Sequence, residues 1–164
     1  MRVFRAVEAD IPDLRQFILD AWRTVGPSAW GWTGATEEAI ERISSNEYLN
    51  SMVSDAGKDL LVAREHNKIV GFAIDRKIDE KTVELAGMIV EEASTGKGVG
   101  SALLANAKAA ACERGYNTMV VKTEAFNRRA ISFYKSRGFV ETGKGEENVE
   151  GTKVRLVILG LSLR

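Results

Sequence analysis

The sequence predicts an α/β fold of the mixed α+β type: one domain, residues 1–164, around a central twisted mixed sheet of about seven strands with helices on both faces. Its 164 residues suffice for one core without disulfides or metals. Three β-rich runs follow one another closely in the middle of the chain, as antiparallel hairpins do. Strand and helix patterns alternate toward the C-terminus, which requires parallel strands joined by helical crossovers.

The N-terminal part begins with a strand over residues 3–7, followed by a helix that starts after Asp10 and has apolar residues at helical spacing. Residues 26–34, rich in glycine and tryptophan, are expected to form a loop. Thr36 is expected to cap a second helix that runs to about residue 53, with two glutamates in its first turn.

The rest of the chain completes the pattern of one strand, two helices, three strands, helix, strand, helix and two strands. The expected elements are strands at 59–64, 69–78 and 82–90, a helix at 98–114, a strand from 119, a helix at 127–137, and closing strands at 139–142 and 154–163 around an acidic loop at 146–150.

Composition excludes several functional classes. Lysine plus arginine and aspartate plus glutamate both total 23, so no overall charge attracts nucleic acid or an anionic membrane. One histidine and one cysteine cannot form a zinc site, and no metal is expected. His66 is expected in a surface hairpin turn, and Cys112 as a packed thiol suited to a reducing compartment. Without a leader or an apolar run of about 18 residues, we expect a cytoplasmic protein without a membrane partner.

A glycine-rich turn, Thr95-Gly96-Lys97-Gly98-Val99-Gly100-Ser101, follows a strand and opens a helix. Glycines let the backbone approach a ligand, and the N–H groups of a helix N-terminus attract phosphate, so a pyrophosphate is the natural guest. The spacing excludes a P-loop, because Glu91 and Gly98 stand where that motif needs glycine and serine or threonine. A dinucleotide fingerprint fails because Ser101 replaces its third glycine. Taken alone, the turn is also compatible with a tight strand-to-helix connection.

A second segment changes the weight of that alternative. Residues 127–139, Asn-Arg-Arg-Ala-Ile-Ser-Phe-Tyr-Lys-Ser-Arg-Gly-Phe, combine an asparagine cap, a helical apolar stripe and Tyr134. Gly-x-Gly-x-Gly after a strand, followed by Asn-x-x-Ala-x-x-Phe-Tyr-x-x-x-Gly-Phe, resembles the GNAT acetyltransferase superfamily, whose element order matches the whole chain. The resemblance implies an acetyl-CoA-dependent N-acetyltransferase that acts by direct attack in a ternary complex.

The resemblance also implies roles for individual residues. The amides of the glycine turn hold the cofactor pyrophosphate, and Thr95 departs from the glutamine or arginine usual there. The backbone of residues 88–90 pairs with pantetheine and polarises the thioester, Asn127 contacts the pantetheine region, and Tyr134 protonates the departing thiolate or anchors its sulfur. The implied cofactor-binding set is Met88, Ile89, Val90, Thr95, Gly96, Lys97, Gly98, Val99, Gly100, Ser101, Asn127, Phe133 and Tyr134.

The attacking amine must be uncharged, so a base or a water relay must accept its proton. Glu84 stands on the strand where some GNAT members place a catalytic glutamate, and the alternative for it is a solvated carboxylate. Members that acetylate ribosomal N-termini have a glutamate where this chain has Lys122, so their mechanism does not carry over. Glu124 with Lys122 is interpreted as a surface charge pair.

The acceptor site, by the same resemblance, is lined by the loop after the first helix and by residues 145–151. Trp30 and Trp32 there are expected either to stack on the acceptor or to form a lid. Glu146, Glu147 and Glu150 would favour a polyamine or basic peptide, or are simply a solvated loop. The acceptor is a small-molecule or peptide amine, and a homodimer is left open. The alternatives are a non-catalytic acyl-CoA-binding regulatory module, and transfer of a longer acyl group or to a hydroxyl.

Overall fold

The computed structural model describes residues 1–29, 37–149 and 151–164. These residues form a seven-stranded mixed sheet and five α-helices, so the predicted fold class is confirmed. The strands are β1 (Arg2–Arg5), β2 (Lys58–Glu65), β3 (Lys68–Lys77), β4 (Thr82–Val90), β5 (Thr118–Glu124), β6 (Val140–Val149) and β7 (Thr152–Ser162). The helices are α1 (Ile11–Ala29), α2 (Glu37–Ile43), α3 (Asn46–Ser54), α4 (Val99–Glu113) and α5 (Arg128–Lys135), with short 3-10 turns η1 (Glu8–Asp10) and η2 (Glu92–Ser94).

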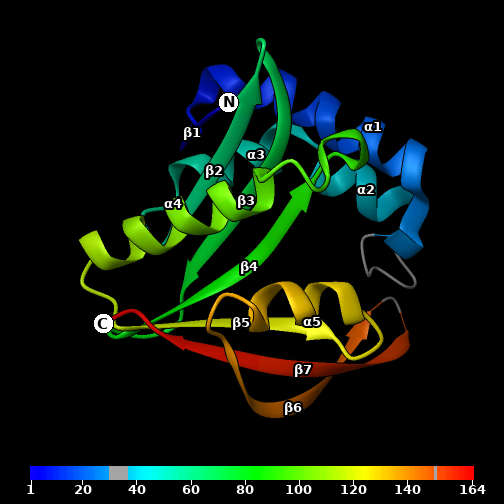
Figure 1. Cartoon of the computed structure of the whole chain (residues 1–164). Coiled ribbons are helices and arrows are strands. Elements are labelled where there is room, and N and C mark those ends of the chain that lie inside the picture. Colours follow the sequence, from blue (N-terminus) through cyan, green and yellow to red (C-terminus); the bar gives the residue numbers. More distant parts are fainter. Residues whose placement is uncertain (30–36, 150) are drawn as a thin grey trace.

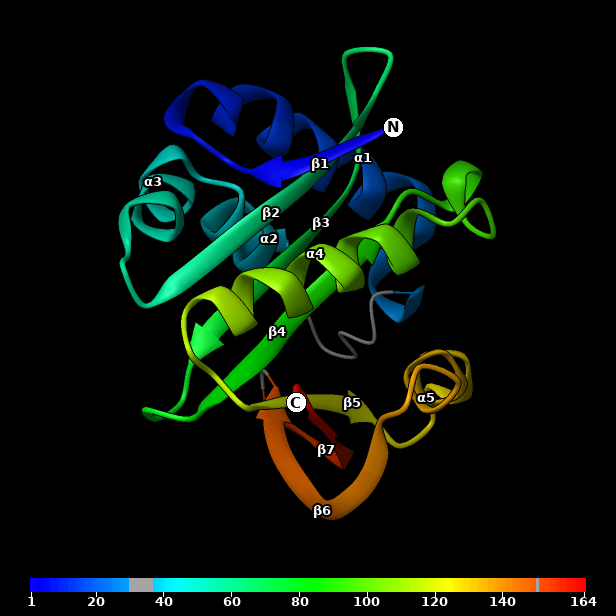
Figure 2. The same ribbon diagram turned by 60° about the vertical axis from the view of Figure 1, so that its left-hand side comes forward.

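The sheet has the order β1-β2-β3-β4-β5-β7-β6, and β4 with β5 is its one parallel pair within the described chain. A parallel pair needs a crossover, which α4 provides. Helix α4 covers one face of β1 to β4, while α1 and α3 cover the other (Figures 1 and 2). The sequence therefore builds a layered molecule in which the sheet separates two sets of helices.

Each face of the sheet has its own apolar core. Under α4, Leu103 and Ala107 pack in one cluster with Leu85 of β4 and Met119 of β5. Tyr134 of α5 belongs to the same cluster, which places α5 on the α4 side. The opposite cluster joins helices α1 and α3 to the sheet and comprises Ala6, Ile11, Leu14, Phe17, Ile18, Leu49, Met52, Leu60, Val62, Ile69 and Phe72.

The helix expected over residues 36–53 is two helices, α2 and α3. Ser45 causes the break: its backbone is extended (φ −66°, ψ 149°), and its hydroxyl accepts a hydrogen bond from the Tyr48 N–H at 3.2 Å, which caps α3. Serine competes with helical hydrogen bonds in this way. The expected cap, Thr36, lies outside the described residues. Helix α1 continues to Ala29, three residues beyond the start of the predicted loop.

The predicted acidic loop at 146–150 is wrong where it can be checked. Strand β6 extends from Val140 to Val149, far past the predicted end at residue 142. Glu146 faces Arg155 and Glu147 faces Val154 in the β6–β7 ladder, so backbone pairing with the long β7 outweighs the low strand propensity of these glutamates. Glu150 lies outside the described residues.

Two single-residue expectations met different outcomes. His66 and its neighbour Asn67 adopt positive φ angles of 48° and 66° in the β2–β3 turn, as the hairpin interpretation requires. Cys112 was expected to be packed, but it is exposed on α4, where its thiol donates to the Leu163 carbonyl with an S···O distance of 3.6 Å.

No helix of the described residues is both long and apolar enough to cross a bilayer.

Candidate active site

Strand β4 separates from its parallel partner β5 halfway along its length. Their pairing ends at Leu85 opposite Val121, although β5 stays paired with β7 as far as Glu124. Figure 1 shows the two strands diverging beyond this point. Residues 86–90 of β4 therefore have β3 on one side and, in the described chain, no strand on the other. We call residues 86–90 the free edge.

A bulge marks the start of the free edge. Ile74 of β3 faces Gly87 and Asp75 faces Leu85, so Ala86 is left without a partner. An extra residue of this kind bends its strand and increases the local twist. The bulge thus accounts for the direction in which β4 leaves β5.

The glycine turn connects the end of the free edge, through η2, to helix α4. Gly96 and Gly98 have φ angles of +78° and +85°, and Gly98 is the left-handed residue that precedes the first turn of α4. A Cβ atom added to either glycine would meet no atom within 4 Å. The turn therefore faces open space at the N-terminus of α4, as a pyrophosphate cradle requires.

Helix α5 is held directly against this turn. A Cβ atom on Gly100 would lie 3.5 Å from the Phe133 ring, and the Arg137 guanidinium stacks on that ring at 3.7 Å from its centroid. Arg137 Nη2 also donates to Ser101 Oγ at 2.6 Å. The two sequence motifs are thus joined in space through Phe133 and Arg137, and no role was predicted for Arg137.

Tyr134 is 6% exposed and borders the cavity described below. Its ring makes edge contacts with Phe133 and Phe139 at centroid distances of 5.2 and 5.3 Å. Burial, and after it the negative charge of Glu124, raises the pKa of Tyr134 to about 12. The phenol therefore keeps its proton at neutral pH and is available as a donor.

Asn127 caps α5. Its side-chain oxygen accepts a hydrogen bond from the Ala130 N–H at 3.1 Å. Because this oxygen is engaged in the cap, the contact with pantetheine that the resemblance implies would have to be made by other atoms of Asn127. The residue also borders the cavity.

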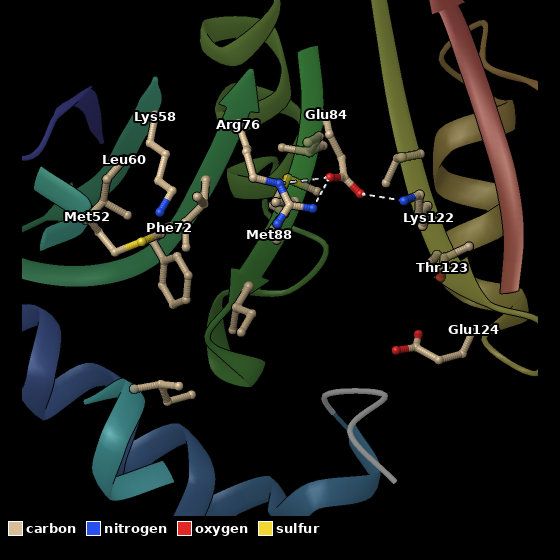
Figure 3. A pocket seen from close by; sticks show the side chains of 18 of the residues that line it. Met52, Lys58, Leu60, Phe72, Arg76, Glu84, Met88, Lys122, Thr123 and Glu124 are labelled. Atoms are coloured by element: carbon tan, nitrogen blue, oxygen red, sulfur yellow. Dashed lines mark hydrogen bonds and ion pairs between the residues drawn. The ribbon is translucent and has the colours of Figure 1, made fainter. Parts of the chain in front are cut away.

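A cavity of about 720 Å³ lies between the free edge, β5 and the helices α1 to α3. Glu84, predicted to be either a catalytic base or a solvated carboxylate, lines it and is only 4% exposed. One of its oxygens, Oε2, accepts hydrogen bonds from both Nε and Nη2 of Arg76. The other, Oε1, lies 3.6 Å from Lys122 Nζ (Figure 3). Glu84 is therefore neither solvated nor free, because cations hold both oxygens.

Glu124 was interpreted as surface charge, and the structure contradicts this. It is the last residue of β5, is half-buried and lines the same cavity. Burial raises the pKa of Glu124 and the negative charge of Glu147 raises it further, while hydrogen bonds to its own backbone, Asn127 and Thr123 act in the opposite direction. No ion pair reaches its carboxylate from any described residue.

The sequence interpretation also missed Arg76, Lys58 and Phe72, which line the cavity from β2 and β3. Strand alternation could have placed Phe72 and Arg76 on one face of β3. The predicted acceptor loop, with Trp30 and Trp32, lies outside the described residues. Glu146 and Glu147 do line the cavity, and Glu146 pairs with Lys153 at 3.4 Å.

Known proteins resemble this chain in sequence and in structure. The human N-acetyltransferase 8B is 28% identical over 118 residues, which are 69% of this chain and 52% of that protein, so the match spans about half of the relative's length. The ribosomal-protein-alanine N-acetyltransferase of Brucella melitensis superposes with a TM-score of 0.76 at 25% identity, over 99% of both chains. The PaiA N-acetyltransferase of Thermoplasma acidophilum, solved in complex with coenzyme A, gives 0.75 at 20% identity over 98% of both chains.

The model of one protein family covers most of the chain. It is the model of the acetyltransferase (GNAT) family, and it matches residues 13–139, a range that contains the free edge, the glycine turn, α5 and the segment after α5 as far as Phe139. The same segments form the site described above. This chain therefore belongs to the GNAT acetyltransferase family.

Proposed function

We propose that this protein transfers the acetyl group of acetyl-CoA to a primary amine by direct attack in a ternary complex. The observation that supports this most is that the free edge of β4 lies between an open glycine turn at one end and a buried, protonated tyrosine beside the cavity. Coenzyme A, with a pyrophosphate, an extended amide-containing arm and a terminal sulfur, fits that sequence of groups.

Each part of the site has a task in this reaction. When bound, acetyl-CoA supplies an activated acyl thioester. The glycine-turn amides hold the pyrophosphate, and backbone groups of the free edge orient the thioester carbonyl, as fixed donors do where negative charge develops. Tyr134 holds a proton on Oη for the departing sulfur. A group in the cavity must take a proton from the incoming ammonium, because only the neutral amine attacks.

A covalent acyl-enzyme is not part of the proposal. Cys112 is exposed near the C-terminal end of α4 and does not line the cavity. A nucleophilic cysteine needs a neighbouring base and access to the thioester. The cavity instead leaves space on the β5 side for an amine to approach directly.

Release of free coenzyme A from acetyl-CoA tests the proposal, measured over polyamines, amino acids, aminoglycosides and basic peptides. Turnover with at least one amine, with the acetylated product identified by mass spectrometry, is the expected result. Propionyl-CoA and hydroxyl acceptors in the same assay check the acyl length and the acceptor atom. Thermal stabilisation by acetyl-CoA without transfer to any acceptor would instead support the non-catalytic regulatory module.

A further inference from the structure

We infer that Glu124 binds the ammonium group of the acceptor and accepts its proton, so that the acceptor is an aliphatic amine that is charged in solution. The inference rests on the proposed function and assigns its missing base. Glu124 lies outside the two sequence motifs, three residues before Asn127, with which it is hydrogen-bonded, and its position in the cavity is a result of the fold.

In the cavity, Glu124 and Glu84 differ in the cations that surround them. Figure 3 shows the Glu124 carboxylate directed into the cavity from the end of β5, with no interaction drawn to it, whereas Glu84 is connected to Arg76 and Lys122. A base needs a free lone pair within reach of the substrate proton. Glu124 has hydrogen bonds to its own backbone, Thr123 and Asn127 but forms no ion pair within the described chain, whereas Glu84 would have to release a cation first.

Glu124 also lies near Tyr134, the proposed acid. The charge of Glu124 raises the pKa of Tyr134, so the two groups interact electrostatically. Both border the cavity beside Asn127. An amine bound by Glu124 would therefore approach the thioester from the side on which the protonated Tyr134 lies. The base and the acid would then flank the same reacting centre.

The protons balance as follows. The ammonium R–NH₃⁺ gives one proton to the Glu124 carboxylate and becomes R–NH₂. A bond forms from its nitrogen to the thioester carbon, the carbon–sulfur bond breaks, and the thiolate takes the Tyr134 proton. The second proton lost by the nitrogen returns to Tyr134, and Glu124 releases its proton to water. The sum is amide, coenzyme A and one proton.

The charged surroundings agree with a carboxylate that binds a cation. Glu147 of β6 lies close enough to raise the pKa of Glu124, which gives the ammonium a second negative neighbour. Three of the cations that line the cavity are paired with other acids: Lys122 and Arg76 with Glu84, and Lys58 with Asp55 at 3.3 Å; a further one, Arg42, comes from α2. The titratable groups that share the cavity with Glu124 are Arg42, Tyr48, Lys58, Arg76, Glu84, Lys122, Tyr134, Glu146 and Glu147.

The test compares Glu124→Gln with Glu84→Gln, and uses Glu113→Gln, an exposed glutamate at the end of α4 outside the cavity, as the matched control. With an aliphatic amine that the wild-type protein acetylates, Glu124→Gln should lower kcat/KM by about 10²-fold or more and remove the acid limb of its pH profile. Glu124→Asp should keep the acid limb at a reduced rate. Glu84→Gln and Glu113→Gln should both retain the wild-type limb.

Binding provides a readout that does not depend on turnover. Calorimetry of the amine with protein saturated by coenzyme A should show at least tenfold weaker binding in Glu124→Gln, at unchanged affinity for coenzyme A. If Glu124→Gln keeps both the acid limb and the amine affinity, or if Glu84→Gln loses the limb instead, the assignment is wrong. A wild-type protein that acetylates no amine would contradict the proposed function itself, which separates the two failures.

Discussion

The two halves of β4 differ in what holds them. Over Val83–Leu85 the strand is paired on both edges, and its one cavity-facing carboxylate, Glu84, is held by two cations. Over residues 86–90 only β3 pairs with it, and the nearest acid on β5, Glu124, has no cationic partner among the described residues. Strand β4 thus has a closed, charge-compensated half and a half with unused hydrogen-bonding groups, beside which β5 places the Glu124 carboxylate.

The comparison shows where binding and chemistry are expected. The free edge is partly exposed, and its unpaired backbone N–H and C=O groups can pair with an extended ligand, so we expect the ligand there. In the closed half the carboxylate of Glu84 already has cationic partners, so no ligand is expected there. We therefore expect substitutions at the open half to affect binding and turnover, and substitutions at the closed half to affect stability.

The largest effect is expected from Gly98→Val, at the far end of the free edge. A side chain would enter the open space that the glycine turn faces and would strain a backbone with φ +85°. Affinity for coenzyme A should fall by more than about 10²-fold, measured by calorimetry. Gly115→Val is the matched control, since Gly115 has the same φ and the same open surroundings at the other end of α4. Similar losses in both variants would mean that strain, and not ligand exclusion, explains the result.

Tyr134→Phe should lower turnover by about 10²-fold and leave the affinity for coenzyme A nearly unchanged, because only the donated proton is lost. Tyr116→Phe, at an equally buried tyrosine of the same core cluster that does not line the cavity, serves as the control. Rates for both should be measured between pH 6 and 9. Full turnover by Tyr134→Phe would remove this residue as the acid.

Asp75→Asn tests the junction between the halves. Burial, and then the charge of Asp59, raises the pKa of Asp75 to about 7, and both of its carboxylate oxygens are buried without a hydrogen-bond partner. In the unfolded chain this group ionises near pH 3.9, so the folded protein loses stability as the pH rises from about 4 to 7. The variant should lack this loss and gain about 2 kcal/mol over wild type between pH 5 and pH 8 in urea unfolding. Parallel stability curves would contradict the assignment.

The smallest effect is expected in the closed half. Glu84→Gln should cost only about 1 kcal/mol of unfolding free energy, because Arg76 and Lys122 are each about half exposed and regain water when the ion pairs are lost. Thermal unfolding at low and high salt measures this, and the loss should shrink as salt rises. A loss above about 3 kcal/mol would show that the closed half depends on this cluster.

Local chemistry explains what the sequence could predict. A few neighbouring residues determine helix caps, glycines at positive φ and hydrophobic periodicity. The element order, the glycine turn and the Asn127 cap of α5 could therefore be predicted. The break at Ser45 was missed because an apolar helical pattern continues across it. The extension of β6 was missed because its glutamates have low strand propensity, and only the partner strand β7 holds them in place.

The candidate site divides in the same manner. Tyr134 and the turn belong to motifs, but the position of Glu124 depends on the divergence of β4 from β5, which is a property of the sheet. From the alternation of β5 alone, Glu124 and Lys122 share a face, and nothing in that pattern says that the face borders a cavity lined also by the β6–β7 hairpin and three helices. Whether a polar face borders a cavity is decided by segments distant in sequence.

The extra residue Ala86 changes which side chains of β4 face which side of the sheet. Before it, odd-numbered residues, Val83 and Leu85, pack toward α4; after it, even-numbered residues, Met88 and Val90, do so, while Ile89 packs against the opposite core. Which face of the sheet a β4 side chain reaches thus depends on which side of Ala86 it stands. Counting in twos from Glu84 assigns Met88 to the wrong core, and removing Ala86 by mutation would exchange the two faces for the rest of the strand.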